Sequence, residues 1–402
     1  MKHFYWLLLL SCFSFYGQIA IQGKIIDAAT LEPLPYVNVF SLEVRQGVYT
    51  NEDGIFRFEI MPGLKEVTIS CLGYKTLVVP VGTFQNGEKV IPLELDEYLL
   101  DEVILTSKPL HEIMLELIDN SKQRLAQNVK LDTYFREFLI INNQYSKFCD
   151  GLVDYYIKPK RKDKVESYVI VNQSRAFELT AADKIESNGK MDMSALNSLS
   201  NFKNKANDFF NLDIIENYLT KAKDSKKYDF EIRTQVGSNG RIFEKIIIKP
   251  LNTVEQQLIE GEIVYDAKDR VILDVDLKTA ASHSQYAELR SMLLFKFKIY
   301  DLQLKMSFLK EGDKYIPNYK KEIFDFYVKF GKQINDRFKV VNDLLVNHYY
   351  DFNINIPEEE NLYQKKSIYE NGMNYTSEYW NSNMAMPLSG KEEKILKVLQ
   401  NL

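Results

Sequence analysis

The first part of the chain alternates short apolar runs with turn residues at regular spacing. Residues 19–26 predict a first strand, and Phe56 and Phe58 alternate with charged neighbours, which gives a later strand one apolar and one polar face. Asp53 and Gly54 stand between extended runs, so they predict a hairpin turn in which glycine takes a positive φ. Short strands at this spacing are typical of a small β-sandwich.

Longer amphipathic and extended segments follow from residue 110 onward. Apolar residues at helical spacing predict a helix across 110–127 and a second, partly buried helical stretch across 194–223. Extended aromatic runs predict strands near 134–140, 148–157, 168–171, 230–236, 242–248, 258–265, 271–277, 295–308, 315–330 and 338–350. Turn residues at 237–240 and 266–270 predict two hairpins, and a last helix is predicted at 391–402.

Composition supports a folded, mainly β chain. Of the 402 residues, 45% are hydrophobic and 27% are charged, which is close to the globular average. The 25 Tyr and 24 Phe favour strands, because flat rings pack well on a pleated surface. A net charge of −5 from well-mixed acids and bases supplies no basic field, which argues against nucleic acid as a partner.

The first 18 residues predict an export signal. Lys2 begins a short polar start, residues 4–10 are apolar, and residues 16–18 make a plausible processing region. The apolar stretch is too short to span a bilayer, and the alternative is a buried first strand or helix. Residues 9–12 also resemble a lipobox ending at Cys12, but apolar residues continue after it, so we favour export without lipidation. The expected location is the periplasm or the outer membrane.

Two cysteines, Cys71 and Cys149, remain after the signal. Each stands next to apolar, strand-like sequence, and we expect both to be buried free thiols. The alternative is a disulfide formed in an oxidising compartment, which would cross the predicted domain boundary.

Several ordered motifs point to a known family for the first quarter of the chain. The segments GKIID at 23–27, PLPYVNV at 33–39, TNEDGIF at 50–56 and GYKT at 73–76 together resemble the carboxypeptidase regulatory-like domain of exported Bacteroidetes proteins. The resemblance implies a transthyretin-like, seven-stranded sandwich with no catalysis of its own. In carboxypeptidases this sandwich follows a zinc peptidase domain, and the sequence shows no such peptidase.

The expected fold class is mainly β with some helix: an N-terminal seven-stranded β-sandwich followed by a curved antiparallel sheet with helices. The succession of hairpins is similar to that of lipoprotein-carrier half-barrels, with helices on the concave side. Residues 379–402 look like the tail of uncharacterised Bacteroidetes proteins. The predicted boundaries are a signal peptide at 1–18, the sandwich at 19–96, a linker at 97–109, and the helix-plus-β domain at 110–402.

The linker contains the segment LDEVILT at 100–106. A similar stretch lies between this sandwich and the plug of TonB-dependent receptors, where it can include the segment that engages the energy-coupling protein. We favour a last strand plus linker, because residues 103–105 form a strand-like run. A receptor barrel needs more membrane strands than the remaining chain can hold.

Candidate chemistry is sparse. His111 is followed by Glu112 but lacks the second histidine of a zinc peptidase motif, and we expect it to be an exposed helix residue. His283 is expected in a turn, and His348 has Asp351 three residues later, a spacing too common to indicate a metal. No nucleophile elbow, P-loop or dinucleotide-binding motif is present, so we predict no catalytic, cofactor-binding or metal-binding residues and no cofactor.

Acidic clusters also favour structural explanations. Residues 51–53 could offer oxygen ligands to calcium, but they lack the acids and the closing Glu of an EF-type loop, so a hairpin turn is favoured. The run at 358–360 follows a proline and predicts a solvated loop.

The leading hypothesis is a non-enzymatic cell-envelope protein. Its sandwich would be an interaction or spacer module, and its β domain would bind a hydrophobic, lipid-like ligand or an outer-membrane or periplasmic protein. The aromatic content motivates the ligand, although the same rings could simply fill the core. Two alternatives stay open: an accessory component of a TonB-dependent outer-membrane transport system, and an unrecognised hydrolase with carboxylates or His283 in one cleft.

Overall fold

The structure is a computed structural model, and it describes most of residues 20–401. The positions outside the described residues are 1–19, 42, 45, 60–62, 72, 85–86, 88, 97–101, 105, 126–127, 162–163, 179–201, 238–239, 293–294, 312, 333, 352–354, 377–379, 381–385 and 402. The predicted signal peptide with Cys12 therefore lies outside the described residues. So do much of the predicted linker and the start of the second predicted helix.

The N-terminal sandwich has two layers. Among the described residues its strands are β1 (Ala20–Asp27), β2 (Asn38–Ser41), β3 (Gln46–Tyr49), β4 (Ile55–Glu59), β5 (Glu66–Ser70), β6 (Leu77–Pro80) and β7 (Lys89–Leu93). One layer has the order β4-β1-β7, and the other has the order β6-β5-β2-β3. Ile25, Phe56 and Val67 are fully buried between the layers. The predicted seven-stranded sandwich is confirmed.

The turn at residues 51–54 is a corner between the two layers, so the predicted hairpin is wrong. Strands β3 and β4, which it joins, belong to different sheets. The Asn51 side-chain oxygen accepts hydrogen bonds from the backbone N–H groups of Asp53 (3.0 Å) and Ile55 (2.9 Å), so one side chain bends the backbone. Gly54 has the expected positive φ, +75°, and a Cβ there would stand 2.5 Å from the Ile25 carbonyl oxygen.

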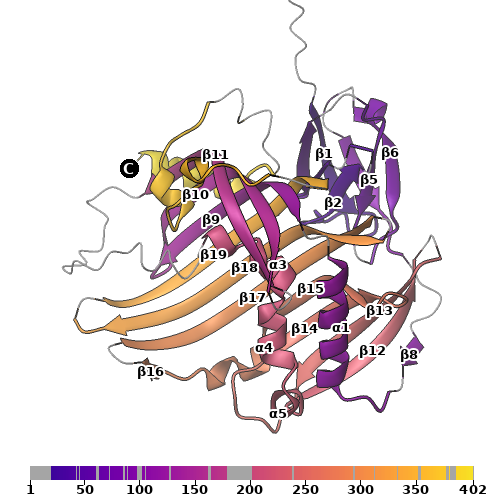
Figure 1. The fold of residues 1–402 in the computed structure, drawn as a ribbon, viewed down its shortest axis with the longest axis vertical. Helices are drawn as coiled ribbons and strands as arrows, with labels where there is room; N and C mark the ends of the chain where they lie inside the picture. Colours follow the sequence, from indigo (N-terminus) through magenta and orange to yellow (C-terminus); the bar gives the residue numbers. More distant parts are fainter. Residues whose placement is uncertain are drawn as a thin grey trace, which may run out of the picture.

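A larger antiparallel sheet makes up most of the molecule (Figure 1). Its described strands are β8 (Glu102–Ile104), β9 (Val129–Ile141), β10 (Gln144–Lys160), β11 (Lys164–Glu178), β12 (Tyr228–Val236), β13 (Ile242–Pro250), β14 (Ile259–Asp266), β15 (Val271–Thr279), β16 (Arg290–Met292), β17 (Phe295–Glu311), β18 (Lys314–Phe330) and β19 (Ile334–Asp351). The order is β8-β12-β13-β14-β15-β17-β18-β19-β9-β10-β11, with β16 beside β17. Because β8 and β11 do not pair, the sheet stays an open half-barrel, as predicted.

Helices cover the concave face of this sheet (Figure 1). They are α1 (Leu110–Arg124), α3 (Asn207–Asn211), α4 (Asp213–Leu219) and α5 (Ala222–Ser225). Met114 and Leu117 of α1 are fully buried in one core with the sheet, which confirms the predicted first helix and its packing. The second predicted helical stretch is confirmed in its described part, where it consists of several short helices. Leu212 takes the left-handed conformation (φ +52°) and separates α3 from α4, and a 3₁₀ turn, η3 (Phe202–Asn204), precedes them.

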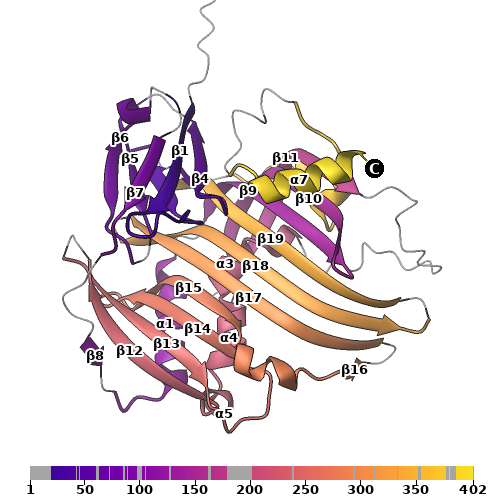
Figure 2. The same cartoon turned by 180° about the vertical axis from the view of Figure 1, so that it is seen from behind.

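The convex face carries the sandwich and the C-terminal helix α7 (Gly390–Asn401), which lies over β10 and β11 (Figure 2). Leu396 of α7 is buried with Phe138 and Phe148. Strand β3 meets β19 at one bridged pair, Gln46 opposite His348, so the sandwich sheet continues into the large sheet. In the described part of the chain, no helix has the length and apolar character needed to cross a membrane.

Candidate functional site

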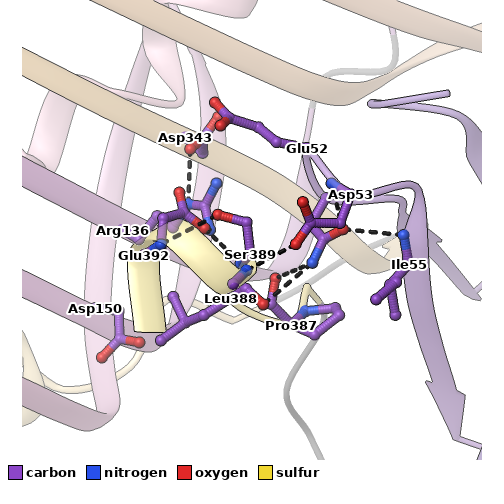
Figure 3. A network of polar contacts seen from close by, with 12 residues as sticks. Glu52, Asp53, Ile55, Arg136, Asp150, Asp343, Pro387, Leu388, Ser389 and Glu392 are labelled. Atoms are coloured by element: carbon purple, nitrogen blue, oxygen red, sulfur yellow. Dashed lines mark hydrogen bonds and ion pairs between the residues drawn. The ribbon is translucent and has the colours of Figure 1, made fainter. Parts of the chain in front are cut away.

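The sandwich, the large sheet and α7 meet at a buried polar network (Figure 3). Arg136 comes from β9, Asp343 from β19 and Glu392 from α7. The Arg136 Nε donates to Asp343 Oδ2 at 2.7 Å, and its Nη1 donates to Glu392 Oε2 at 3.1 Å. Arg136 and Asp343 are each only 1% exposed, so this ion cluster is shielded from water. We call these three residues the junction triad.

The start of α7 is capped from two directions. Ser389 and Glu392 form a reciprocal capping box: the Ser389 N–H donates to Glu392 Oε2 (2.8 Å), and the Glu392 N–H donates to Ser389 Oγ (3.3 Å). The Gly390 N–H donates to Asp53 Oδ2 of the sandwich corner at 2.7 Å. A carboxylate at a helix N-terminus is also favoured by the helix dipole. The sandwich thus supplies part of the cap of the C-terminal helix.

Further polar and aromatic contacts extend the junction. The Asn51 amide donates to the backbone carbonyls of Pro387 (3.3 Å) and Leu388 (3.1 Å). The rings of Tyr36 and Tyr49 from the sandwich pack on Tyr319 of β18, with centroids 5.5 and 4.8 Å apart. These contacts join the two domains over several elements, so the sandwich is held in one orientation.

The electrostatics of the triad favour a structural role. Burial alone would lower the pKa of Arg136, but the Asp343 and Glu392 carboxylates raise it above its ordinary value. Burial would raise the pKa of Asp343, yet Arg136 and Lys321 hold it below its usual range. Arg136 and Asp343 are therefore held in their ionised forms, and the guanidinium compensates part of the negative charge of the two carboxylates that it contacts.

A second buried cluster supports the same face. Tyr134 donates to Asp150 Oδ2 at 2.9 Å, and Arg175 Nε donates to Asp150 Oδ1 at 3.0 Å. The Arg175 guanidinium also stacks over the Trp380 ring, 4.3 Å from its centroid. These groups lie under the C-terminal segment and help to hold it on the sheet.

A polar cavity of about 300 Å³ lies at the far end of the molecule from the sandwich. Its lining residues come from α4, α5, the start of β12, residues 256–258 and the segment that carries η4 (Ala281–Tyr286) and β16. Tyr218, Tyr228 and Tyr286 line it, together with Leu258 and Arg290. We call it the polar cavity, and no motif in the sequence predicted it.

The structure places the three histidines in separate surroundings. His111 is half-buried on α1, not exposed as predicted, because its Nδ1 lies 3.2 Å from Ser225 Oγ of α5. His283 lies in η4 as a turn residue, but it is buried, with Nε2 3.2 Å from the Leu251 carbonyl oxygen. His348 packs edge-on against Tyr350 on the large sheet.

Cys71 and Cys149 are free thiols, as expected, although only Cys149 is fully buried. Residues 358–360 are exposed, as predicted. Among the described residues, no cluster of three or more metal-ligating side chains is present. The role of residues 51–53 at the junction was missed, since their partners follow more than 300 positions later in the chain.

The first comparison with known proteins concerns the N-terminal part. Residues 21–105 match the family model of the CarboxypepD_reg-like domain. The sandwich is a carboxypeptidase regulatory-like domain. No curated protein matches the sequence. The match extends to β8, so the family model includes a strand that here pairs with β12 at the edge of the large sheet.

Similarities to solved structures are weak. A DUF1329 family protein from Desulfovibrio piger is 9% identical, with 63% of this chain and 96% of that chain covered and a TM-score of 0.24. Lipovitellin, solved for its lipid–protein interactions, is 8% identical, with 58% and 26% covered and a TM-score of 0.26. A Bacteroides ovatus protein of unknown function is 6% identical, with 82% and 78% covered and a TM-score of 0.11. These values carry no argument about function.

The regulatory-like domain sits close to a carboxylate of unusual pKa, Asp274 of β15. Burial first, and then the Asp274 carboxylate, raise the pKa of Cys71 in the domain to about 11. Burial raises the pKa of Asp274 itself to about 7, and the Asp276 carboxylate acts in the same direction while Lys305 opposes it. Asp274 therefore titrates near neutral pH.

Replacing Asp274 with asparagine should make the protein more stable at pH 8 but not at pH 4. The folded pKa lies above the unfolded value of about 3.9, so the folded state loses stability as pH rises from about 4 to about 7. Asparagine cannot ionise and removes this loss. Because Asp274 is partly exposed, we expect a gain of about 1–2 kcal/mol, well below the full shift. Urea unfolding of both proteins at the two pH values measures it, and an equal effect at both would contradict the assignment.

Proposed function

We propose that this chain is a non-enzymatic protein of the cell envelope that acts as one rigid binding unit. The regulatory-like domain and the half-barrel would present a single fixed surface to a ligand or an envelope partner. The observation that carries this proposal is the junction triad with the capped helix α7, which ties both domains to the C-terminal segment.

Rigid attachment favours an interaction module over a spacer. A flexible spacer needs few contacts with its neighbour, whereas here buried ions, a helix cap and packed tyrosine rings cross the boundary. The buried charges are committed to these contacts, which supports a binding role more than a catalytic one.

The packing of the concave face favours a polar ligand over the hydrophobic ligand expected from the sequence. A lipid-like ligand needs apolar room on the concave face, but in the described residues the side chains of α1, α3 and α4 pack there against the sheet. Phe135 and Tyr155 contact Phe202 in this core, so the rings of this region serve packing. The polar cavity, by contrast, offers about 300 Å³ of space lined by polar side chains.

Two other functions receive less support. The segment that resembles a TonB-linked stretch contributes β8, which pairs with β12, so it is committed to the sheet. A hydrolase needs a carboxyl group able to donate a proton. Asp224 at the polar cavity has its pKa lowered by a hydrogen bond from Lys227, which keeps it ionised, and Asp274, whose pKa is raised to about 7, is not among the residues that line the cavity.

Expression of the full chain in a Gram-negative host tests the proposal. We expect the protein in the periplasmic or outer-membrane fraction without residues 1–18, and Leu8→Arg in the apolar signal run should leave it unprocessed in the cytoplasm. Small-angle scattering of the purified protein should match one rigid particle. A cytoplasmic protein that retains its first 18 residues would refute the envelope role, and scattering from two independently moving domains would refute the rigid unit.

A Cys12→Ser variant separates the two forms of export. If the chain is exported without a lipid anchor, as we favour, this variant fractionates like the parent protein. Loss of membrane association in the variant alone would show lipidation and change the proposed anchoring.

A further inference from the structure

We propose that the polar cavity binds a neutral, polyhydroxylated ligand, with a saccharide as the chemical class. This inference rests on the proposed binding function and names its ligand. The cavity volume of about 300 Å³ lies at the lower end of the range for small-molecule sites, about 300–1,000 Å³. A ligand the size of a mono- or disaccharide fits such a space.

Three tyrosines from separate elements line the cavity. Tyr218 comes from α4, Tyr228 from the start of β12 and Tyr286 from the end of η4. A sugar ring has C–H faces that pack on aromatic rings and hydroxyl groups that hydrogen-bond around its edge. Burial raises the pKa of Tyr218 and raises that of Tyr228 to about 12, so both hydroxyls stay protonated at neutral pH.

The walls of the cavity are fixed before any ligand arrives. The Gln257 amide nitrogen donates to the backbone carbonyls of Ile299 (3.1 Å) and Tyr300 (3.3 Å), which holds the amide at the wall with its oxygen left as an acceptor. Tyr286 packs on the buried His283 ring, with centroids 5.7 Å apart. Such preorganisation reduces the entropy that a ligand must overcome on binding.

The charges at the cavity indicate a neutral ligand. Lys227 and Asp224 neutralise each other in an ion pair of 2.8 Å. Arg290 and Glu288 also line the cavity, are exposed, and make no ion pair with any residue in the described part of the chain. The two acids and two bases balance, so the cavity carries no net charge that would select an anion or a cation, and an apolar ligand would leave these groups without partners. A guanidinium and a carboxylate can instead each bond a pair of neighbouring hydroxyls.

Calorimetric titration of the full exported protein tests the site. The probes are maltose, cellobiose, xylobiose, mannobiose and chitobiose, with a heparin disaccharide and phosphatidylglycerol vesicles as charged and lipid alternatives. We expect at least one neutral oligosaccharide to bind. Tyr286→Ala and Glu288→Gln should each raise its Kd by about tenfold or more, as expected when a stacking ring or a hydrogen-bonding group is lost.

Matched variants outside the cavity serve as controls. Tyr350→Ala removes a partly exposed ring on β19, and Arg161→Gln removes an exposed charge in the turn after β10; both should leave the Kd unchanged. Because Glu288 and Arg290 are exposed, their variants should keep the parent melting temperature, and Arg290→Gln should weaken binding like Glu288→Gln.

The outcomes separate this inference from the proposed function. Binding of heparin or vesicles alone, no binding of any neutral oligosaccharide, or binding that the cavity variants leave unchanged would each overturn the saccharide site. Export and scattering as a rigid particle would still stand in those cases. Cleavage of a bound oligosaccharide would support the site and overturn the non-enzymatic proposal.

Discussion

Replacing Arg136 with methionine is expected to lower the free energy of unfolding by about 3–5 kcal/mol. Methionine keeps much of the side-chain volume but leaves Asp343 in the interior without its cationic partner, and Glu392 loses the same partner. A buried carboxylate without a counter-charge is costly because it has lost its hydration. Urea unfolding followed by circular dichroism at pH 7 measures the loss.

Two further variants show whether burial is the cause. Lys75→Met breaks an exposed ion pair with Glu94, and it should cost less than about 1 kcal/mol. Adding Asp343→Leu to Arg136→Met should recover part of the loss, because the most deeply buried unpaired charge is then gone. A loss for Arg136→Met as small as that for Lys75→Met would contradict the role of the junction triad.

The junction also explains why the C-terminal helix belongs to the folded unit. α7 takes its capping contacts from Ser389, Glu392 and the sandwich residue Asp53, while its apolar side packs on β9 and β10 through Leu396. Arg136 and Asp53 contact the same end of α7. A substitution that breaks the junction triad should therefore weaken the attachment of both α7 and the regulatory-like domain to the large sheet.

The regulatory-like sandwich could be predicted from sequence because its signals are local. The turn at Asp53 and Gly54, the alternation around Phe56 and the ordered motifs each depend on neighbours within a few positions. What these signals could not show is that β3 and β4 enter different sheets. Two extended runs joined by Asp-Gly occur both in hairpins, which stay in one sheet, and in corners, which connect two sheets. Here the hydrogen bonds of the Asn51 side chain to the backbone stabilise the corner.

The junction could not be predicted in the same way. Arg136 is followed by Glu137, and Asp343 is preceded by Asn342, so each stands in a short polar stretch of its strand. Charged side chains at such positions are usually exposed to solvent. Arg136 and Asp343 are buried only because α7 and the sandwich cover their face of the sheet, and Glu392 arrives from 256 positions beyond Arg136. The sequence of a strand does not indicate whether a segment from a distant part of the chain covers one of its faces.

The helical region and the polar cavity show two other limits. Apolar periodicity predicted a partly buried helical stretch across 194–223, and its described part, 202–223, is helical and partly buried. The periodicity could not reveal the left-handed Leu212, which divides this part into short helices. The cavity draws residues from α4, β12, η4 and β16, so its chemistry exists only after folding. Conversely, Asn142 and Asn143 carry a local signal that was overlooked: both take positive φ (48° and 68°) in the turn between β9 and β10.

Gly261→Ala is expected to destabilise the protein by roughly 3 kcal/mol or more, combining backbone strain with overpacking. Gly261 lies in β14 with a φ of +147°, and a Cβ there would stand 1.9 Å from the Asp276 carbonyl oxygen of β15. That oxygen belongs to the paired backbone of a central strand, so it cannot move away without disturbing the ladder. Thermal and urea unfolding of the variant measure the loss.

Two glycine variants separate the causes. Gly240→Ala also changes a positive-φ position (+76°) but meets nothing within 4 Å, so it should cost only about 1–2 kcal/mol from backbone conformation. Gly82→Ala has neither constraint and should be nearly neutral. If Gly261→Ala lowered the free energy of unfolding no more than Gly240→Ala does, the backbone of β15 would be able to move away from the added methyl group. A clear excess would instead show that the close approach of β14 and β15 is a fixed part of the curved sheet, on which the helices of the concave face depend.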